Sequence, residues 1–388
     1  MPTMEKNNKT LNVPHLRFPE FTGEWESIHL GEISDVTKLA GFEFTEYVRY
    51  EDEGEIIALR GLNCKNGSLD LNDVKYIDNS VLEKLIRSKL CIGDILFTYV
   101  GTVGEVAIIE ENDRFYLAPN VSRIRLRDKY NPYFIKHQLY NKRFYNKVVF
   151  PLIATSSQPA LSMENVRRFK LNIPTISEQD KIAKFLNLLD LRISTQRKII
   201  EKHESLIRGL YHFVFNQPAV ALQLNDVVSV VKGKQVNGED LLEDGKYYMM
   251  NGGTEPSGYL DEYNTPANTI SISEGGNSCG YVQYNTEPFW SGGHCYSLIQ
   301  KEVNINYQYL YHFLKYKERD IMALRIGSGL PNVQKKDLER FEIRLLPIEQ
   351  QNRVAEILEG LSAKCGLEKR VLQRWQSQKS FLLRNLFI

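Results

Sequence analysis

The chain has 388 residues, of which 49 are basic and 48 are acidic, so its formal net charge is +1. This length predicts two domains of ordinary size, and a hydrophobic fraction of 42% is ample for packed cores, which argues against wholesale disorder. The balanced charge lowers the expectation of nucleic-acid binding but leaves local basic faces open.

The N-terminal stretch MPTMEKNNKTLNVPHLRF lacks the apolar segment of a secretory signal peptide. No stretch of the sequence reaches the roughly 18 uninterrupted apolar residues of a membrane-spanning helix. The five cysteines are scattered and odd in number, which predicts free thiols in a reducing compartment. A cytoplasmic protein is therefore expected.

The first 175 residues read as a mixture of strands and helix. Short apolar segments separated by Gly, Asn and Asp predict strands, namely EIIALRGLN, CIGDILFTYVG, VGEVAIIE and VSRIRLR. The stretch YNPYFIKHQLYNKRFYNKVV then has helical spacing, and Pro132 suits an early helical position. An α+β domain is the prediction for this part of the chain.

A ten-residue segment occurs twice in the chain. SEQDKIAKFL begins at Ser177 and EQQNRVAEIL begins at Glu349, and matched residues such as Gln179 and Gln351 lie 172 positions apart. At the same offset, an alternating pattern that predicts a short strand precedes each segment, in FKLNI and in FEIRL. A weaker echo links WESIHLGEISDV to AVALQLNDVVSV. The repeat predicts a duplicated frame that holds two divergent inserts.

Each repeated segment opens a long helical pattern with apolar residues at alternating steps of three and four. These seam residues are Leu186, Leu189, Ile193, Ile200, Ile207 and Leu210 in the first copy and Leu358, Leu361, Leu372, Trp375 and Leu382 in the second. Such a narrow stripe predicts a coiled coil, which is antiparallel if a two-fold axis relates the halves. The polar seam residues, which would fix its register, are Gln196, His203, Glu368 and Lys379. Two long helices packed in separate domains are the alternative.

The second insert repeats the order of the first. NTISISEGG, GYVQYN and FWSGGHCYSLI predict strands, and YQYLYHFLKYKERDIMAL predicts an amphipathic helix. The expected parts are a first domain over residues 1–175, a spacer helix over 176–215, a second domain over 216–347 and a second spacer helix over 348–388. The expected fold class is α+β, with two pseudo-two-fold-related mixed α/β domains separated by a long antiparallel two-helix coiled coil.

The sequence offers no convincing catalytic motif. VVKGKQ lacks the leading Gly and the Ser/Thr of a phosphate-binding P-loop. An adenine methyltransferase needs a glycine-rich cofactor loop and an Asn-Pro-Pro-Tyr type motif, whereas Asn131-Pro132-Tyr133-Phe134 lacks the second proline. Cys279, together with GGHC ending at Cys295, leaves a tetrahedral zinc site incomplete. The enzyme hypothesis is therefore weak from the residues alone, and a buried thiol with a loop histidine is favoured over a zinc site.

Local clusters of basic residues suggest contact with phosphates. Arg123, Arg125 and Arg127 alternate in SRIRLR, which places three guanidinium groups on one face of a strand. The second insert offers Lys232, Lys234 and Arg325. Such clusters can neutralise phosphates in a salt-sensitive manner, although a solvated surface is the alternative for each residue taken singly.

Reading of bases needs hydrogen-bonding groups on loops that can enter a groove. The candidates are Arg60, Asn63 and Lys65; Ser156, Ser157 and Gln158; Asn251, Gly252, Gly253 and Thr254; Gly275, Gly276 and Asn277; and Ser328 and Gly329. Glycine lets a backbone approach a base or phosphate closely. Each of these loops, taken alone, also fits a tight turn between strands.

The assembled pattern resembles the specificity (S) subunit of a type I restriction-modification system. The resemblance rests on NVPHLRFPEFTGEWE, on IPTISEQDKIAKFL and on LLPIEQQNRVAEIL, and it covers essentially all 388 residues. NGGTEPSGYL, FWSGGHCYSL and SGLPNVQKKDLERFEI are similar to one subclass of the family's target-recognition domains.

This resemblance implies two target-recognition domains that each read one half of a split double-stranded DNA sequence, with the helix pair as the spacer. It also implies two methyltransferase subunits, which bring S-adenosylmethionine, and endonuclease subunits that join through them and use ATP and Mg. The chain itself is then non-catalytic. A non-catalytic adaptor with two variable domains and, less favoured, a self-sufficient DNA methyltransferase or nuclease are the alternatives.

Overall fold

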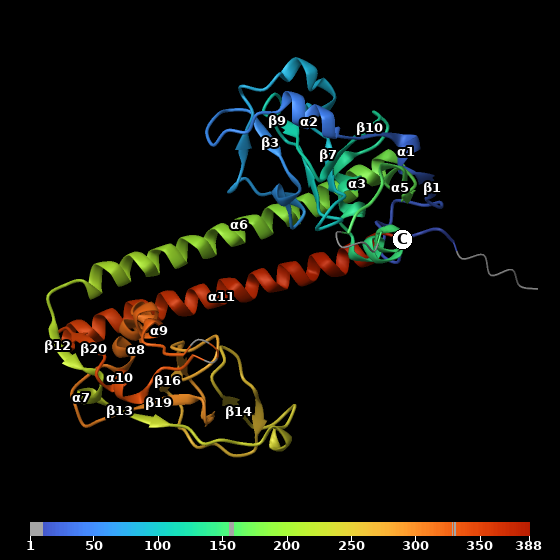
Figure 1. Ribbon diagram of the computed structural model, residues 1–388. Coiled ribbons are helices and arrows are strands. Elements are labelled where there is room, and N and C mark those ends of the chain that lie inside the picture. Colours follow the sequence, from blue (N-terminus) through green and yellow to red (C-terminus); the bar gives the residue numbers. More distant parts are fainter. Residues whose placement is uncertain (1–10, 155–158, 328, 330) are drawn as a thin grey trace, which may run out of the picture. The chain divides into compact units, whose positions relative to one another are not determined.

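The computed structural model describes residues 11–154, 159–327, 329 and 331–388 (Figure 1). The chain forms two compact units. The first unit comprises residues 1–195 and 372–388, and the second comprises residues 196–371. Each unit therefore combines one insert with parts of two long helices, α6 (Ile176–Phe215) and α11 (Ile348–Leu386). The domain boundaries expected from the sequence, which keep each helix whole, stay a prediction.

The first unit begins with a run of short strands. Its elements before α6 are β1 (Glu26–His29), α1 (Leu30–Ile33), β2 (Ser34–Lys38), α2 (Gly41–Tyr47), β3 (Ile57–Leu59), β4 (Cys64–Lys65), β5 (Ser68–Leu69), β6 (Lys75–Tyr76), β7 (Ile95–Thr98), β8 (Val106–Ile108), β9 (Phe115–Leu117), β10 (Val121–Leu126), α3 (Pro132–Leu139), α4 (Lys142–Phe144), α5 (Met163–Arg167) and β11 (Lys170–Ile173). The helix expected after β10 is broken, because the Asn141 side chain accepts the N–H of Arg143 and starts α4.

The second unit repeats this order. Its elements between the long helices are β12 (Val220–Gln223), α7 (Leu224–Val227), β13 (Val228–Lys232), β14 (Tyr247–Met250), β15 (Gly258–Leu260), β16 (Thr269–Ser273), β17 (Val282–Asn285), β18 (Trp290–Ser291), β19 (Cys295–Gln300), α8 (Tyr307–Tyr316), α9 (Glu318–Ala323), α10 (Lys335–Glu339) and β20 (Glu342–Leu345). Asn306 caps α8 by accepting the N–H of Tyr309, as Asn131 caps α3 by accepting those of Tyr133 and Phe134.

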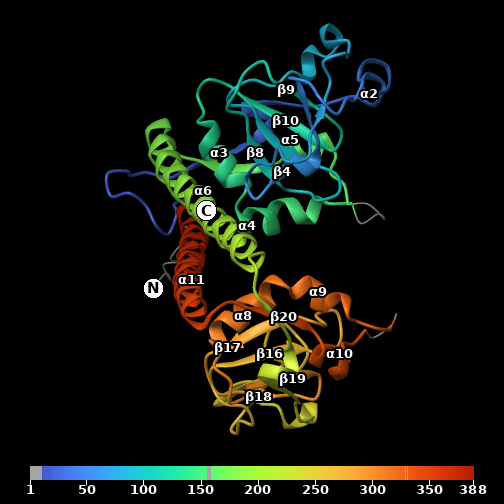
Figure 2. The same ribbon diagram turned by 90° about the vertical axis from the view of Figure 1, so that its left-hand side faces the viewer.

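The sheets of the two units have the same topology. The four-stranded antiparallel sheets are ordered β2-β10-β7-β8 and β13-β19-β16-β17. Figure 2 labels β8 and β10 of the first sheet and β16, β17 and β19 of the second. The three-stranded sheets are ordered β6-β3-β9 and β15-β14-β18, and in both the middle strand is antiparallel to the first and parallel to the last. The pairs β1-β11 and β12-β20 also match, whereas the β4-β5 hairpin of the first unit has no counterpart among the described strands of the second. The predicted duplication of a mixed α/β frame is therefore confirmed.

In the first unit, α6 and α11 pack in antiparallel directions. Lys379 lies 2.5 Å from Asp190, and the guanidinium of Arg192 lies over the ring of Trp375. Residue numbers along α11 therefore decrease as those along α6 increase. The apolar seam here is Leu186, Leu189 and Ile193 with Leu372, Trp375 and Leu382. Lys136 of α3 also pairs with Asp190, at 3.1 Å, so the sheet domain is joined to the helix pair by charge as well as by packing.

In the second unit, the remaining parts of α6 and α11 also pair. Gln196 donates from Nε2 to Glu368 Oε2 at 2.5 Å, and Lys369 lies 2.7 Å from Glu204. Ile200 and Leu358 are buried, whereas Ile207, Leu210 and Leu361 are partly buried. The pairing of α6 with α11 in each unit agrees with the predicted antiparallel coiled coil and not with two helices packed separately.

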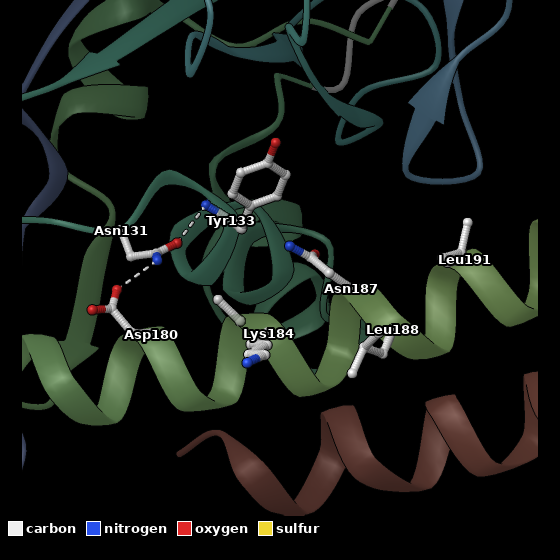
Figure 3. A pocket seen from close by; sticks show the side chains of 8 residues that line it. Asn131, Tyr133, Asp180, Lys184, Asn187, Leu188 and Leu191 are labelled. Atoms are coloured by element: carbon white, nitrogen blue, oxygen red, sulfur yellow. Dashed lines mark hydrogen bonds between the residues drawn. The ribbon is translucent and has the colours of Figure 1, made fainter.

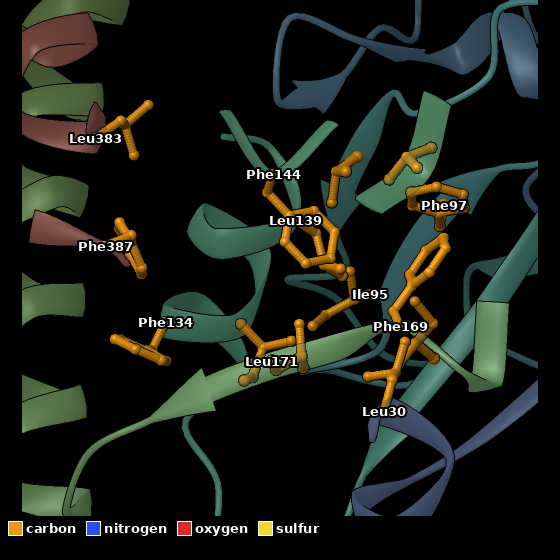
Figure 4. Packing of buried hydrophobic residues seen from close by; sticks show 14 of the residues in the cluster. Leu30, Ile95, Phe97, Phe134, Leu139, Phe144, Phe169, Leu171, Leu383 and Phe387 are labelled. Atoms are coloured by element: carbon orange, nitrogen blue, oxygen red, sulfur yellow. The ribbon is translucent and has the colours of Figure 1, made fainter. Parts of the chain in front are cut away.

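The C-terminal turns of α11 belong to the core of the first unit (Figure 4). Phe387 packs against Phe134 and Trp25, with ring centroids 5.2 and 6.3 Å apart. Phe215, at the end of α6, makes the matching contact with Tyr309 in the second unit, at 5.4 Å. An aromatic residue at the end of a long helix, Phe387 or Phe215, is therefore part of each core.

Candidate nucleic-acid interface

Five segments of the second unit converge at one end of its four-stranded sheet. We call them the second loop cluster, and they are residues 232–235, 251–254, 274–277, 291–294 and 331–333. They meet because β19 is antiparallel to both β13 and β16, so its start lies beside the ends of those strands.

Backbone hydrogen bonds hold the second loop cluster together. The N–H of Glu274 donates to the carbonyl of His294 at 2.9 Å, and the N–H of Val333 donates to the carbonyl of Glu274 at 2.8 Å. The N–H of Gly276 donates to the carbonyl of Pro331 at 3.0 Å. The loops therefore form one surface and are not independent turns.

Glycine permits the close approach of three of these loops. A Cβ on Gly233 would lie 2.2 Å from the carbonyl oxygen of Gly292, and a Cβ on Gly292 would lie 2.6 Å from Oδ1 of Asn251. Both distances are far below a normal contact, and at Gly233 the opposing atom is backbone, which cannot swing aside as a side chain can. Larger residues at Gly233 would force the loops apart.

The side chains of the second loop cluster are mainly polar. Glu274 is 8% exposed, and its Oε1 accepts from Lys232 Nζ at 2.6 Å and from the hydroxyl of Tyr296 at 2.9 Å. The side chain of His294 is 61% exposed, and its Nδ1 lies 3.8 Å from Glu274 Oε2. Lys232 and His294 therefore converge on a single buried carboxylate.

The first unit holds the matching first loop cluster. It comprises residues 38–41, 60–63, 99–104, 118–120 and 159–161. The N–H of Tyr99 donates to the carbonyl of Asn120 at 3.1 Å, and that of Leu161 donates to the carbonyl of Tyr99 at 2.8 Å. Glu274 makes the same two backbone hydrogen bonds in the second loop cluster, donating to His294 and accepting from Val333. The ammonium of Lys38 lies 5.1 Å from the ring centroid of Tyr99.

The candidate residues Arg60 and Asn63 act largely within the fold. Asn63 is fully buried, accepts the N–H of Arg60 at 3.0 Å and donates to the carbonyls of Asp70 and Asp73. Arg60 pairs with Asp73 at 2.8 Å. Lys65 is exposed. Asn63 and Arg60 therefore shape the loop, and Lys65 is free to reach a partner.

Two of the three alternating arginines form ion pairs with carboxylates, and the third lies far from the first loop cluster. Arg123 is buried and pairs with Asp35 at 2.5 Å, and Arg125 pairs with Asp94 at 2.7 Å. Arg127 is exposed but follows the C-terminal end of β10, whereas the first loop cluster lies at the N-terminal end of this strand. The sequence showed their common face but not the acidic partners on neighbouring elements.

Most candidates of the second insert lie together in or beside the second loop cluster. The described ones are Lys232, Lys234, Asn251, Gly252, Gly253, Thr254, Gly275, Gly276, Asn277, Arg325 and Gly329. Ser156, Ser157, Gln158 and Ser328 lie outside the described residues. The sequence patterns did not identify Lys38, Tyr99, Asn120 and His294, because no periodic signal marks these loop residues and their counterparts lie at differing offsets along the chain.

The buried hydroxyls and thiols of the clusters are not activated. Burial raises the pKa of Tyr99, and burial followed by the hydrogen bond to Glu274 raises the pKa of Tyr296. Burial also raises the pKa of Cys295 to about 11, so its thiol stays protonated. Among the described residues no group of three or more His, Cys, Asp or Glu could hold a metal ion. The clusters offer hydrogen-bond donors and acceptors on close-packed loops, which is the chemistry of recognition.

A separate groove of about 430 Å³ runs along α6 and α3 in the first unit (Figure 3). Leu188 and Leu191 line it and are 55% and 64% exposed. Asn131 closes one end of the groove by donating to Asp180 Oδ1 at 2.7 Å.

Across the described residues, no helix is both long and apolar enough to cross a membrane.

Comparison with known proteins gives consistent matches. The family model described as the type I restriction modification DNA specificity domain matches residues 22–204 and 219–374. A putative type I restriction enzyme specificity subunit from Methanocaldococcus jannaschii is 21% identical over 416 aligned residues, covering 97% of this chain and 95% of that protein. A putative type I specificity subunit from Mycoplasma pneumoniae is 35% identical over 137 residues, which are 35% of this chain and 36% of that protein.

A solved structure shows the same fold. The crystal structure of the type I restriction-modification system S subunit from M. genitalium has a TM-score of 0.74 and 20% sequence identity to this chain. The match covers 97% of this chain and 99% of that one.

Proposed function

The chain belongs to the type I restriction-modification DNA specificity family, and from this premise we propose that its two loop clusters each read one half of a split target in double-stranded DNA. Residues up to about 175 carry the first reading head, and residues 216–347 carry the second. The long helices α6 and α11 connect the heads and set the number of unread base pairs between the half-sites.

One observation carries this proposal. The two loop clusters share a backbone frame, since Tyr99 and Glu274 make the same pair of backbone hydrogen bonds, but the side chains on that frame differ. A duplicated frame with unlike side chains is suited to reading two unlike sequences, because base-edge contacts depend on the donors and acceptors presented.

The partners follow from the family and from the charge of the chain. We assign methylation to two methyltransferase subunits that bring S-adenosylmethionine, and cleavage to endonuclease subunits that join through them and use ATP and Mg. A net charge of +1 is low for a protein that holds DNA alone, so the partners supply part of the phosphate contact. The isolated chain then binds DNA more weakly than the assembled complex at the same salt concentration.

Co-expression with the cognate methyltransferase subunit tests the proposal. Mapping methylated adenines across the host genome is expected to return two half-sites separated by a fixed unread spacer. Replacing residues 1–175 with those of another member should change one half-site and leave the other unchanged. Methylation by the purified chain alone would favour a self-sufficient enzyme, and partner binding without sequence-specific DNA binding would favour an adaptor.

A further inference from the structure

We infer that Asn120 and His294 occupy the same position in the two reading heads and select the base read there, with Asn120 selecting adenine and His294, together with Lys232, selecting guanine. This assignment rests on the proposed function and adds the residues and the chemistry of each head.

Strand register makes the two positions equivalent. In the first unit Ser122 of β10 is paired with Lys38 of β2 and with Phe97 of β7. In the second unit Tyr296 of β19 is paired with Lys232 of β13 and with Ile272 of β16.

Counting from these pairs, two residues before Ser122 is Asn120, and two residues before Tyr296 is His294. Two residues after Phe97 is Tyr99, and two residues after Ile272 is Glu274. The backbone hydrogen bonds agree, because Tyr99 donates to the carbonyl of Asn120 and Glu274 donates to that of His294.

Both positions project from the clusters. Asn120 is exposed and has a φ of 72°, a left-handed conformation that Asn tolerates better than most residues. The side chain of His294 is 61% exposed. Among the described residues, the Asn120 amide has no hydrogen-bond partner. In each head one buried residue contacts a lysine and also binds the backbone of the reading residue. Tyr99 lies under Lys38 and donates to Asn120, and Glu274 binds Lys232 at 2.6 Å and donates to His294.

The chemistry of the two side chains differs. An Asn amide offers a donor and an acceptor side by side, which matches N7 and the N6 amino group of adenine in the major groove. At the second head the amide is replaced by an imidazole, and the Lys232 ammonium converges with it on Glu274. The Lys232 ammonium and an imidazole N–H are hydrogen-bond donors, which match the paired acceptors N7 and O6 of guanine.

The central experiment places the amide of the first head in the second. His294→Asn, in the full chain co-expressed with the cognate methyltransferase, is expected to change one guanine of the second half-site to adenine in the methylation map and to leave the first half-site unchanged. His212→Asn, which replaces an exposed histidine on α6, is the matched control and should leave both half-sites unchanged.

A second variant tests the first head. Asn120→Gly keeps the left-handed backbone and removes the amide, so discrimination at one position of the first half-site should fall roughly 10- to 100-fold. Equal thermal unfolding midpoints for variant and wild type would show that the fold is intact. If the wild type gives a split motif and neither variant alters it, the base assignment is wrong but the proposed function stands. A wild type without a split motif would overturn the proposed function, and the assignment with it.

Discussion

The side-chain amide of Gln179 joins the backbone of Asn131 to that of Pro174. Its Oε1 accepts the backbone N–H of Asn131 at 3.0 Å, and its Nε2 donates to the carbonyl of Pro174 at 2.9 Å. Gln351 does the same in the second unit, accepting from Asn306 at 2.9 Å and donating to Leu346 at 2.7 Å. Because Asn131 and Asn306 cap α3 and α8, the repeated glutamine fixes the start of each of these helices to a long helix.

Replacing Gln179 should destabilise the first unit. Gln179 is 2% exposed, so Gln179→Ala leaves the partly buried N–H of Asn131 and the buried carbonyl of Pro174 without these partners. We expect a loss of about 2–4 kcal/mol in the free energy of unfolding. Chemical denaturation of the full chain, followed by a probe in the first unit, measures this loss.

Two further variants show whether the hydrogen bonds are the cause. Gln179→Glu keeps the acceptor for Asn131 but loses the donor to Pro174, so it should also destabilise the unit. Gln376→Ala, on an exposed face of α11, is the matched control and should change the stability little. Equal stabilities for Gln179→Ala and Gln376→Ala would contradict the anchoring role.

His137 should make the first unit sensitive to mild acid. It is fully buried on α3, its Nε2 lies 2.8 Å from Asn187 Oδ1, and burial followed by the charge of Lys136 lowers its pKa from 6.5 to about 3. Between these values the unfolded chain takes up a proton that the folded chain does not, so stability falls as the pH falls from 6.5 toward 3.

Comparing wild type with His137→Gln isolates this contribution. At pH 7.5 the histidine is neutral in both states, and its titration contributes little. At pH 5 the wild type should have lost about 2 kcal/mol through it, whereas the variant has no such proton to bind. The stability difference between the two proteins, measured by denaturation at both pH values, should therefore shift by this amount.

The features that could be predicted from the sequence are the periodic ones. The spacing of Leu186, Leu189 and Ile193 predicts the long helix because one face of a helix must repeat every three to four residues. The function of Gln179 could not be predicted, because its partner Asn131 lies 48 residues away and is set by tertiary packing.

The candidate site was only partly predictable for the same reason. The alternation of the β10 arginines shows that they share a face, but the order β2-β10-β7 decides that Arg123 meets Asp35. Loop residues such as Asn120 and His294 carry no periodic signal, so their equivalence emerges only from strand register.

Lys38 should contribute to the salt dependence of DNA binding, whereas Arg127 should not. Lys38 is exposed beside the first loop cluster, while Arg127 is seven residues along from Asn120, a strand length of about 23 Å. Lys38→Ala should weaken binding to all sequences and lower the slope of log affinity against log salt by about 1. Arg127→Ala should leave the slope unchanged, as titrations of the assembled complex at several salt concentrations would show. A reduced slope for Arg127→Ala would instead restore the arginine face as a phosphate contact.

Gly233 should be needed for the second half-site alone. A Cβ at this position would lie 2.2 Å from the carbonyl oxygen of Gly292 and 2.4 Å from that of Ser291, so Gly233→Ala must separate the two loops that frame His294. Overpacking of this kind costs about 1–3 kcal/mol, and a displaced loop no longer presents its donors at the right distance.

We therefore expect Gly233→Ala to reduce discrimination at the second half-site by about tenfold or more and to leave the first half-site unchanged. Gly238→Ala is the control, because a Cβ there meets no atom of the described residues within 4 Å. Competition binding of the assembled complex to DNA altered in one half-site at a time distinguishes the two heads. Equal loss at both half-sites would mean that the variant disturbs the whole chain, and no loss at either would mean that the close approach of the loops is not required for reading.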